Sequence, residues 1–292
     1  MLRYRLITGP VLIALLTVFM WLDVNCGCWE GCLPFGVLLT AAASVFAFFG
    51  GVEMTKLLDR AAAHGPLTPV AGGLGAMAMT IATWLVLGGA DVPAGVLVIV
   101  PLAAVMAALL LNGLGRRCSG SVHHTAAAAL STVWVGGGLG VLCGITALAG
   151  WHMLVLVVAV TKCADIGAYT VGCTIGRHKL IPWVSPGKTW EGLAGGIVFA
   201  IAATMLFFEC VMNVGNPAMH DSTTARLGLE AVLGTIIAIA GLGGDLSVSM
   251  LKRDAGVKDS GRSLPGMGGV LDVLDSLLVA APVMWVIMQI MH

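Results

Sequence analysis

Nine apolar stretches, each about as long as a bilayer-crossing helix, follow one another along this chain of 292 residues. The hydrocarbon core of a bilayer is about 30 Å thick and is crossed by roughly 20 residues of α-helix. The stretches are continuous and lack the alternation of apolar and polar residues seen in outer-membrane barrels. The sequence therefore predicts an all-α, polytopic integral membrane protein with about nine transmembrane helices. The predicted helices cover residues 6–23, 34–51, 67–88, 93–113, 125–148, 151–171, 193–213, 228–251 and 271–291.

Charged residues are scarce and balanced. They make up 10% of the chain, whereas soluble domains contain about 25%, so a water-soluble domain of any size is excluded. Lys and Arg together number 15, as do Asp and Glu, and the net charge is +0. Because no basic field is present, we expect no nucleic-acid partner.

The basic residues predict the orientation of the chain. If the N-terminus is cytoplasmic, 13 of the 15 Lys and Arg residues fall in cytoplasmic segments, while Arg226 falls outside and Lys162 lies within a span. This distribution follows the positive-inside rule. No small-residue cleavage pattern follows Arg3 and Arg5, so we expect a retained first span. The prediction is a protein of the cell (inner or plasma) membrane whose functional groups face the cytoplasm.

The whole chain, 1–292, is predicted to be a single transmembrane domain with two unlike halves. Residues 1–150 consist mainly of apolar and small residues, and we interpret them as scaffold. Residues 151–292 hold two charged segments, 165–191 and 244–276. An ionisable group within the hydrocarbon costs about 2.5–3.5 kcal/mol even on lenient scales. These segments are therefore the first candidates for function, and 151–292 is the predicted catalytic half.

The second charged segment combines carboxylates, a lysine and glycines. Asp245, Ser249 and Lys252 are spaced i, i+4, i+7 and form one stripe on a helix. The glycine-rich run 265–269 leads into the last predicted helix, where Asp272 and Asp275 are i, i+3 neighbours. Glycines beside a helix N-terminus can bind an anion, and carboxylates can hold a divalent cation. The alternative is that these carboxylates only complement the helix dipole.

The first charged segment predicts a phosphate-binding helix start. Ser185 is a good N-cap and Pro186 suits the first helical position, so Lys188 and Thr189 are expected on the opening turn. The alternative is a Ser-Pro pair that only caps the helix. Lys162 and Asp165 are expected to form an ion pair within the span, and the pair His123-His124 is expected at the surface of a loop.

These charged segments carry a family resemblance. The run from Ser249 to Asp275 resembles the signature of the CDP-diacylglycerol synthase (phosphatidate cytidylyltransferase) family, which has Ser, Lys-Arg, Lys-Asp, Pro-Gly-His-Gly-Gly and Asp-Arg-x-Asp in that order. Asp165-Ile-Gly-Ala-Tyr169 and Ser185-Pro-Gly-Lys-Thr-Trp-Glu-Gly192 also resemble motifs of that family. The matching signature residues are Ser249, Lys252, Arg253, Lys258, Asp259, Pro265, Gly266, Gly268, Gly269, Asp272 and Asp275.

The resemblance implies transfer of a cytidylyl group from CTP to phosphatidic acid, yielding CDP-diacylglycerol and pyrophosphate. It implies Mg²⁺, either alone or beside a second cation, held by Asp245, Asp272 and Asp275. The implied catalytic residues, which bind phosphates or orient the cations that do, are Lys252, Arg253, Lys258, Asp259 and Asp165. The implied substrate-binding residues are Ser185, Lys188, Thr189, Glu191, Ser249, Gly266, Gly268 and Gly269. The implied partners are CTP, phosphatidic acid and membrane lipid, with a homodimer as the candidate assembly.

Two positions depart from the family signature. Met267 replaces the usual His and Val273 replaces the usual Arg. Neither change removes a carboxylate, and Lys188 and Lys252 remain, so we expect an active enzyme rather than a catalytically silent relative. A CTP-dependent enzyme acting on a polyprenol or archaeal-type lipid stays an alternative. A secondary transporter is disfavoured because the charges cluster at one membrane face and the two halves lack matched interrupted helices.

Overall fold

The protein is a bundle of helices with one small β-hairpin. The computed structural model describes every residue except 1, 26–34, 60–67, 115–119, 213–222 and 292. The predicted all-α membrane fold is confirmed. The elements are α1 (Leu2–Asn25), α2 (Val37–Asp59), α3 (Thr68–Leu87), α4 (Val96–Leu114), α5 (Ser121–Ser131), the π-helix η1 (Thr132–Gly136), α6 (Gly137–Ala149), α7 (Trp151–Ile175), β1 (Lys179–Ile181), β2 (Ser185–Thr189), α8 (Trp190–Phe207), the π-helix η2 (Phe208–Met212), α9 (Thr223–Asp254), α10 (Val270–Leu274) and α11 (Leu277–Met291).

Within the described residues, seven helical segments are long and apolar enough to cross a membrane. Three of the seven combine several elements: α5, η1 and α6 run on as Ser121–Ala149, α8 continues into η2 as Trp190–Val211, and α10 and α11 together cover Val270–Met291. Shorter apolar helices occur at Ala14–Asn25 and Val96–Leu111. Each of the nine predicted stretches thus overlaps a helix, while the number of true spans stays a prediction.

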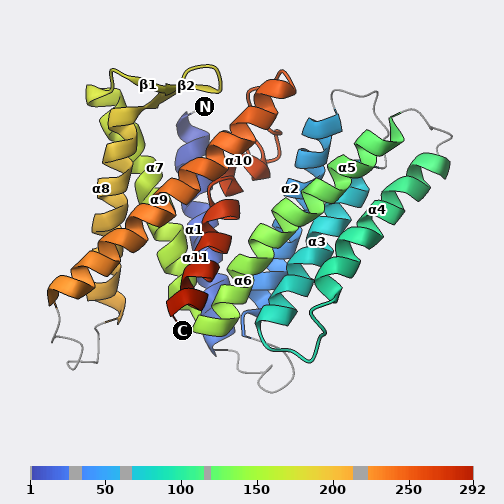
Figure 1. Ribbon diagram of the computed structural model, residues 1–292, viewed down its shortest axis with the longest axis horizontal. Helices are drawn as coiled ribbons and strands as arrows, with labels where there is room; N and C mark the ends of the chain where they lie inside the picture. The colour runs from blue at the N-terminus through green and yellow to red at the C-terminus, as the bar shows by residue number, and fades with distance from the viewer. Residues whose placement is uncertain (1, 26–34, 60–67, 115–119, 213–222, 292) are drawn as a thin grey trace.

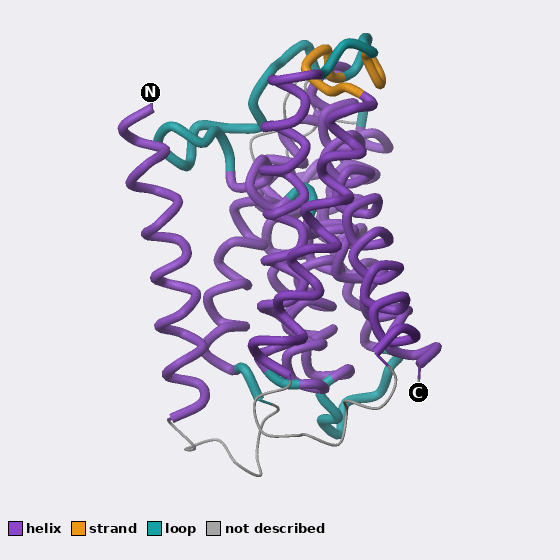
Figure 2. Tube along the Cα trace, turned by 90° about the vertical axis from the view of Figure 1, so that its left-hand side faces the viewer, coloured by secondary structure: helices purple, strands orange, loops and turns teal. Residues whose placement is uncertain are grey.

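The helices run alternately up and down, so several charged chain segments gather on one side (Figure 1). The N-terminus, the end of α2, the β-hairpin and the connection from α9 to α10 all lie at the upper side in that view. Figure 2 shows α1 at the outer edge of the bundle. The shared side includes the segment ends that carry Lys56, Lys179 and Lys252, which agrees with the predicted clustering of basic residues at one membrane face.

Small residues let α7 and α8 approach closely. A Cβ atom on Gly167 would lie 2.8 Å from the carbonyl oxygen of Gly195, and one on Gly195 would lie 3.0 Å from the carbonyl oxygen of Gly167. Contacts of this kind are typical of packed membrane helices. They fix α7, which carries Lys162 and Asp165, against the helix that follows the β-hairpin.

The predicted helix start at Ser185 is wrong. Residues Ser185–Thr189 form β2, which pairs antiparallel with β1 in the register Lys179↔Thr189 and Ile181↔Ser185. The helix starts at Trp190, and its N-cap is Thr189, whose hydroxyl oxygen accepts a hydrogen bond from the Gly192 amide at 3.1 Å. Thr189 is also a good N-cap residue. Backbone pairing with β1 keeps the preceding residues extended, so Lys188 projects from a strand.

The expectation that both neighbouring histidines lie at the surface is also wrong for His124. His124 is 1% exposed, and its Nδ1 atom lies 2.6 Å from Oδ1 of the buried Asp59. His123 is exposed, and its Nε2 atom lies 2.7 Å from the carbonyl oxygen of Leu58. Because His124 belongs to α5 and Asp59 to α2, the pair joins these two helices in the interior.

Candidate active site

The two charged segments meet in one cavity of about 550 Å³, a size within the usual range of small-molecule sites. Its wall includes three lysines and five aspartates contributed by α7, β2, α9, the connection that follows α9, and the start of the last span. These charged lining residues are Lys162, Lys188, Lys252, Asp165, Asp245, Asp259, Asp272 and Asp275. Sequence segments that are far apart therefore converge, as the charge pattern predicts.

Each cavity lysine is paired with one carboxylate. Nζ of Lys188 lies 2.6 Å from Oδ2 of Asp245, and Nζ of Lys252 lies 2.8 Å from Oδ1 of Asp272. The predicted pair of Lys162 with Asp165 is confirmed, with 3.3 Å between Nζ and Oδ2. Three lysines and five aspartates leave more carboxylates than cations, so the cavity has an excess of negative charge that a bound cation would neutralise.

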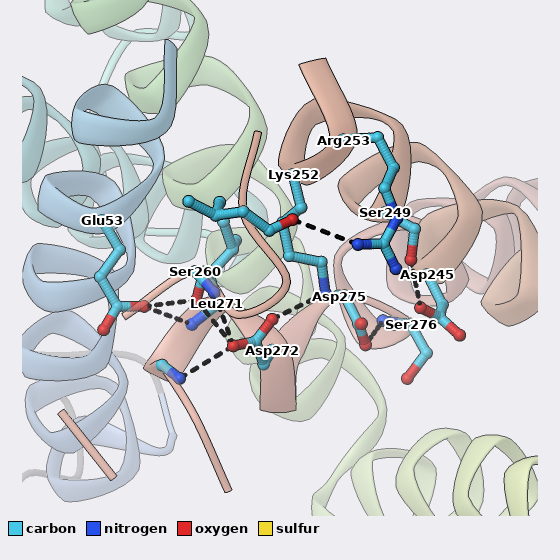
Figure 3. Close-up of polar contacts among 12 residues, drawn as sticks. Glu53, Asp245, Ser249, Lys252, Arg253, Ser260, Leu271, Asp272, Asp275 and Ser276 are labelled. Carbon is cyan, nitrogen blue, oxygen red and sulfur yellow. Dashed lines mark hydrogen bonds and ion pairs between the residues drawn. The ribbon is translucent and has the colours of Figure 1, made fainter. Parts of the chain in front are cut away.

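Asp245 and Asp275 form a carboxylate pair between α9 and the last span. Both side chains line the cavity and the charge of Asp245 acts on Asp275, and Asp275 accepts a hydrogen bond from the Ser276 amide at 2.6 Å. Asp245 accepts a hydrogen bond from the Ser249 hydroxyl at 3.2 Å. The predicted stripe on α9 thus exists, with Ser249 supporting Asp245 rather than lining the cavity (Figure 3).

Asp272 holds the connection that precedes α10. Its Oδ2 atom accepts hydrogen bonds from the amides of Ser260 and Gly269, both at 2.9 Å, while Oδ1 accepts from Lys252. The carboxylate therefore ties the signature loop to both α9 and the start of α10. It also accepts the hydrogen bond of the Gly269 amide, which the sequence predicted to bind substrate.

Glu53 is a structurally important residue that the sequence reasoning missed. It lies on α2, is 5% exposed, and accepts hydrogen bonds from the Ser263 hydroxyl at 2.6 Å and the Leu271 amide at 3.0 Å. The Ser260 hydroxyl oxygen lies 3.0 Å from both the Glu53 and the Asp272 carboxylate (Figure 3). Glu53 belongs to the half interpreted as scaffold, and it anchors the loop of the catalytic half. The available signal was a carboxylate just after the apolar stretch 34–51, in a half of the chain that carries few charges.

The remaining predicted residues divide between the cavity wall and its surroundings. Ser185, Lys188, Thr189 and Asp259 line the cavity. The other five, which do not line it, are Arg253, Lys258, Glu191, Gly266 and Gly268.

Arg253 and Glu191 have structural contacts instead. Arg253 donates from Nε to the carbonyl oxygen of Val184 at 3.1 Å, which braces the β-hairpin. Glu191 accepts from the His178 ring nitrogen Nδ1 at 2.6 Å and from the Arg177 amide at 3.1 Å. Both residues therefore stabilise the hairpin that presents Lys188.

Gly266 and Gly268 shape the turn before α10. Their φ angles are 80° and 95°, a region in which side chains other than glycine are strained. The Leu264 amide donates to the Gly268 carbonyl oxygen at 3.0 Å, so the turn folds back on itself. It places Met267 in the cavity wall.

Asp245 and Asp275 are the carboxylates of the cavity that would hold a magnesium ion. Among the residues that the structure describes, no cluster of three or more His, Cys, Asp or Glu side chains is close enough to hold a metal ion. Mg²⁺, however, is usually held by one or two carboxylates together with substrate phosphates and water. Two neighbouring carboxylates on the wall of one cavity meet that requirement. Asp272 would join them only by giving up its contact with Lys252.

Residues 4–291, nearly the entire chain, match the sequence profile of the Cytidylyltransferase family. The chain belongs to this family. Within it, the uncharacterized protein YnbB of Escherichia coli (strain K12) is 44% identical over 140 residues, which are 47% of this chain and 43% of that protein.

Two relatives in the family carry an activity in their names. The phosphatidate cytidylyltransferase of Haemophilus influenzae is 42% identical over 139 residues, which are 46% of this chain and 44% of that protein. The phosphatidate cytidylyltransferase of Mycobacterium bovis is 36% identical over 143 residues, which are 49% of this chain and 42% of that protein. The matched segment thus spans less than half the length of each of these relatives.

In this cytidylyltransferase-family protein, adjacent glycines on α9 provide a matched test of the site. A Cβ atom on Gly244 would clash with the carbonyl oxygen of Asp275 and lie 3.2 Å from Val279, whereas one on Gly243 would meet nothing within 4 Å. Gly244→Ala is expected to push α9 from the last span, separate the carboxylate pair and reduce cytidylyl transfer at least about tenfold.

Gly243→Ala is the control for this prediction and should keep wild-type activity and thermal stability. Both variants are measured for product formation and for the midpoint of thermal unfolding in detergent. Equal activities of the two variants would contradict the view that α9 must pack this closely against Asp275.

Proposed function

We propose that this protein is a phosphatidate cytidylyltransferase, which converts CTP and phosphatidic acid to CDP-diacylglycerol and pyrophosphate in phospholipid synthesis. The observation that carries the proposal is the cavity that brings Asp245 and Asp275 together with three lysines within a membrane protein. Membership in the cytidylyltransferase family and the names of the relatives support the same reaction.

The reaction requires positioning and charge neutralisation more than a strong base. An oxygen of the lipid phosphate attacks the α-phosphorus of CTP, the new P–O bond forms, and the bond from that phosphorus to the β-phosphate oxygen breaks. Pyrophosphate leaves with the electron pair of the broken bond. The lipid phosphate already carries a nucleophilic oxygen, so alignment of the two phosphates supplies most of the rate enhancement.

The basic and acidic side chains of the cavity have different roles in this reaction. Lys188 and Lys252, held by Asp245 and Asp272, are placed to bind substrate phosphates. Asp245 and Asp275 would hold Mg²⁺, alone or beside a second cation. When bound, the ion supplies positive charge at the α-phosphate and at the pyrophosphate leaving group. The Ser185 and Thr189 side chains, which line the same wall, add hydroxyl groups to the phosphate region.

The membrane setting fits a lipid substrate. The diacylglycerol tails can stay in the bilayer while the phosphate enters the polar cavity. The positive-inside distribution favours a cell (inner or plasma) membrane location with the active site on the cytoplasmic side, where CTP is available. We propose a homodimer as the assembly. Because the charge is balanced, we expect no nucleic-acid partner.

The proposal is tested with the protein purified in detergent and supplied with CTP, phosphatidic acid and Mg²⁺. We expect CDP-diacylglycerol and pyrophosphate to form in equal amounts. Polyprenyl phosphate and an archaeal-type diether lipid phosphate serve as competing substrates. Absence of CDP-lipid from phosphatidic acid, or a faster reaction with either competing lipid, would contradict the proposed substrate.

A further inference from the structure

Lys162 is a membrane-embedded lysine on the wall of the cavity. Its ammonium group reaches three oxygen atoms: Oδ2 of Asp165 at 3.3 Å, Oγ of Ser276 at 3.1 Å and the carbonyl oxygen of Val273 at 3.4 Å. Val273 belongs to α10 and Ser276 to the junction of α10 and α11, so these two contacts lie on either side of Asp275 in the sequence. An ionisable residue within a candidate membrane span is a functional candidate by default.

Of the three cavity lysines, Lys162 has the longest ion pair and the most exposed side chain. Its ion pair measures 3.3 Å, against 2.6 Å for Lys188 and 2.8 Å for Lys252. Its side chain is 39% exposed, against 22% and 12% for the other two. Charge-assisted hydrogen bonds of an ammonium group with oxygen are normally about 2.7–2.9 Å long. The three contacts of Lys162 are longer than this. They hold the ammonium group in place, but they are weak enough for it to donate to another oxygen atom.

The location of Lys162 coincides with a missing charge. Position 273 is Val in this chain, where the signature that it resembles has Arg, and the ammonium group of Lys162 lies against the main-chain oxygen of this same residue. The charge of Lys162 also acts on Asp275, a member of the carboxylate pair. A cation supplied by α7 thus lies beside the position at which the last span supplies none.

We propose that Lys162 binds a phosphate group of the substrate in the cavity and replaces the cation that the chain lacks at position 273. This inference rests on the proposed function. The phosphate belongs either to CTP or to the lipid, since both present the same chemistry to an ammonium group.

The first test compares Lys162→Met with wild type in the CDP-diacylglycerol assay. We expect kcat/KM to fall at least about 30-fold, as is usual when one charged donor to a reacting phosphate is lost. A raised KM for CTP would identify the nucleotide as the source of the phosphate, and a raised KM for phosphatidic acid would identify the lipid. Lys162→Arg should retain activity within about tenfold. Lys179→Met, which removes an exposed lysine outside the cavity, is the control and should match wild type.

The second test restores the charge from the other helix. The double variant K162M/V273R is expected to regain at least about tenfold of the activity lost in K162M. Lys162→Gln with V273R repeats the comparison if K162M does not fold. Wild-type activity in both uncharged variants, or no rescue by V273R in either background, would overturn the proposal.

A binding measurement separates this inference from the proposed function. Pyrophosphate with Mg²⁺ should raise the thermal unfolding midpoint of wild type and of Lys179→Met, and should raise that of Lys162→Met by less than half as much. If wild type makes no CDP-diacylglycerol but this difference is found, the proposed function fails and the role of Lys162 stands. If wild type is active and Lys162→Met matches it both in kcat/KM and in its response to pyrophosphate, the role of Lys162 is overturned.

Discussion

Asparagine in place of Asp245 or of Asp275 is expected to lower CDP-diacylglycerol formation at least about a thousandfold. Each substitution removes one member of the carboxylate pair that would hold Mg²⁺, and loss of charge stabilisation at a transferring phosphoryl group has effects on the order of 10²–10³ or more. The two side chains line one cavity, and the charge of Asp245 acts on Asp275. Because removing one of two adjacent negative charges relieves their repulsion, we expect the thermal stability of Asp275→Asn to equal or exceed that of wild type. Asp245→Asn also leaves Lys188 without its ion-pair partner, so its stability is expected to be lower than that of Asp275→Asn.

The control for this prediction is Asp254→Asn, which changes an exposed carboxylate at the end of α9. This variant should keep full activity. Wild type should lose activity in EDTA and recover it when Mg²⁺ is added in excess. Activity within tenfold of wild type in both Asp245→Asn and Asp275→Asn, or full activity in EDTA, would contradict the proposed metal site.

Alanine in place of Asp272 is expected to impair both folding stability and activity. The Asp272 side chain is 11% exposed and accepts hydrogen bonds from the Ser260 and Gly269 amides and from Lys252. Removing one partner of a buried ion pair costs about 3–5 kcal/mol, because the other charge is left without compensation. We expect a lower unfolding midpoint, faster proteolysis between residues 255 and 269, and an activity loss of at least about a hundredfold.

The opposite stability effects distinguish the two kinds of aspartate. Asp272→Ala should be clearly less stable than wild type, whereas Asp275→Asn should not be. Asp254→Ala provides the matched control and should leave the unfolding midpoint and the proteolysis rate unchanged. A stable, protease-resistant Asp272→Ala protein would contradict the structural role of this carboxylate.

The helical membrane fold could be predicted because a bilayer imposes a simple length requirement on apolar segments. The convergence of residues 165–191 with 244–276 could also be predicted, because charges in so apolar a chain gather where they can share a polar cavity. Lys188, Asp245 and Asp275 all reach this cavity as their spacing and charge suggested.

Other features depended on tertiary contacts that no local pattern specifies. Ser185-Pro186 is a favourable helix start, but the strand pairing with β1 moves the cap to Thr189. Glu53 lies more than 200 positions before the loop that it anchors, so its hydrogen-bond partners, Ser260, Ser263 and Leu271, could not be identified from sequence spacing. His124 was misjudged for the same reason, since its burial depends on Asp59 in another helix.

The most direct test of the central claim follows the phosphorus atoms of CTP into the lipid. Purified protein is incubated with phosphatidic acid, Mg²⁺ and CTP labelled either at the α-phosphate or at the γ-phosphate. The account predicts that the α-label enters the lipid as CDP-diacylglycerol and that the γ-label appears in pyrophosphate. Transfer of the γ-label to the lipid would reveal a CTP-dependent kinase, and absence of the α-label from the lipid would contradict cytidylyl transfer.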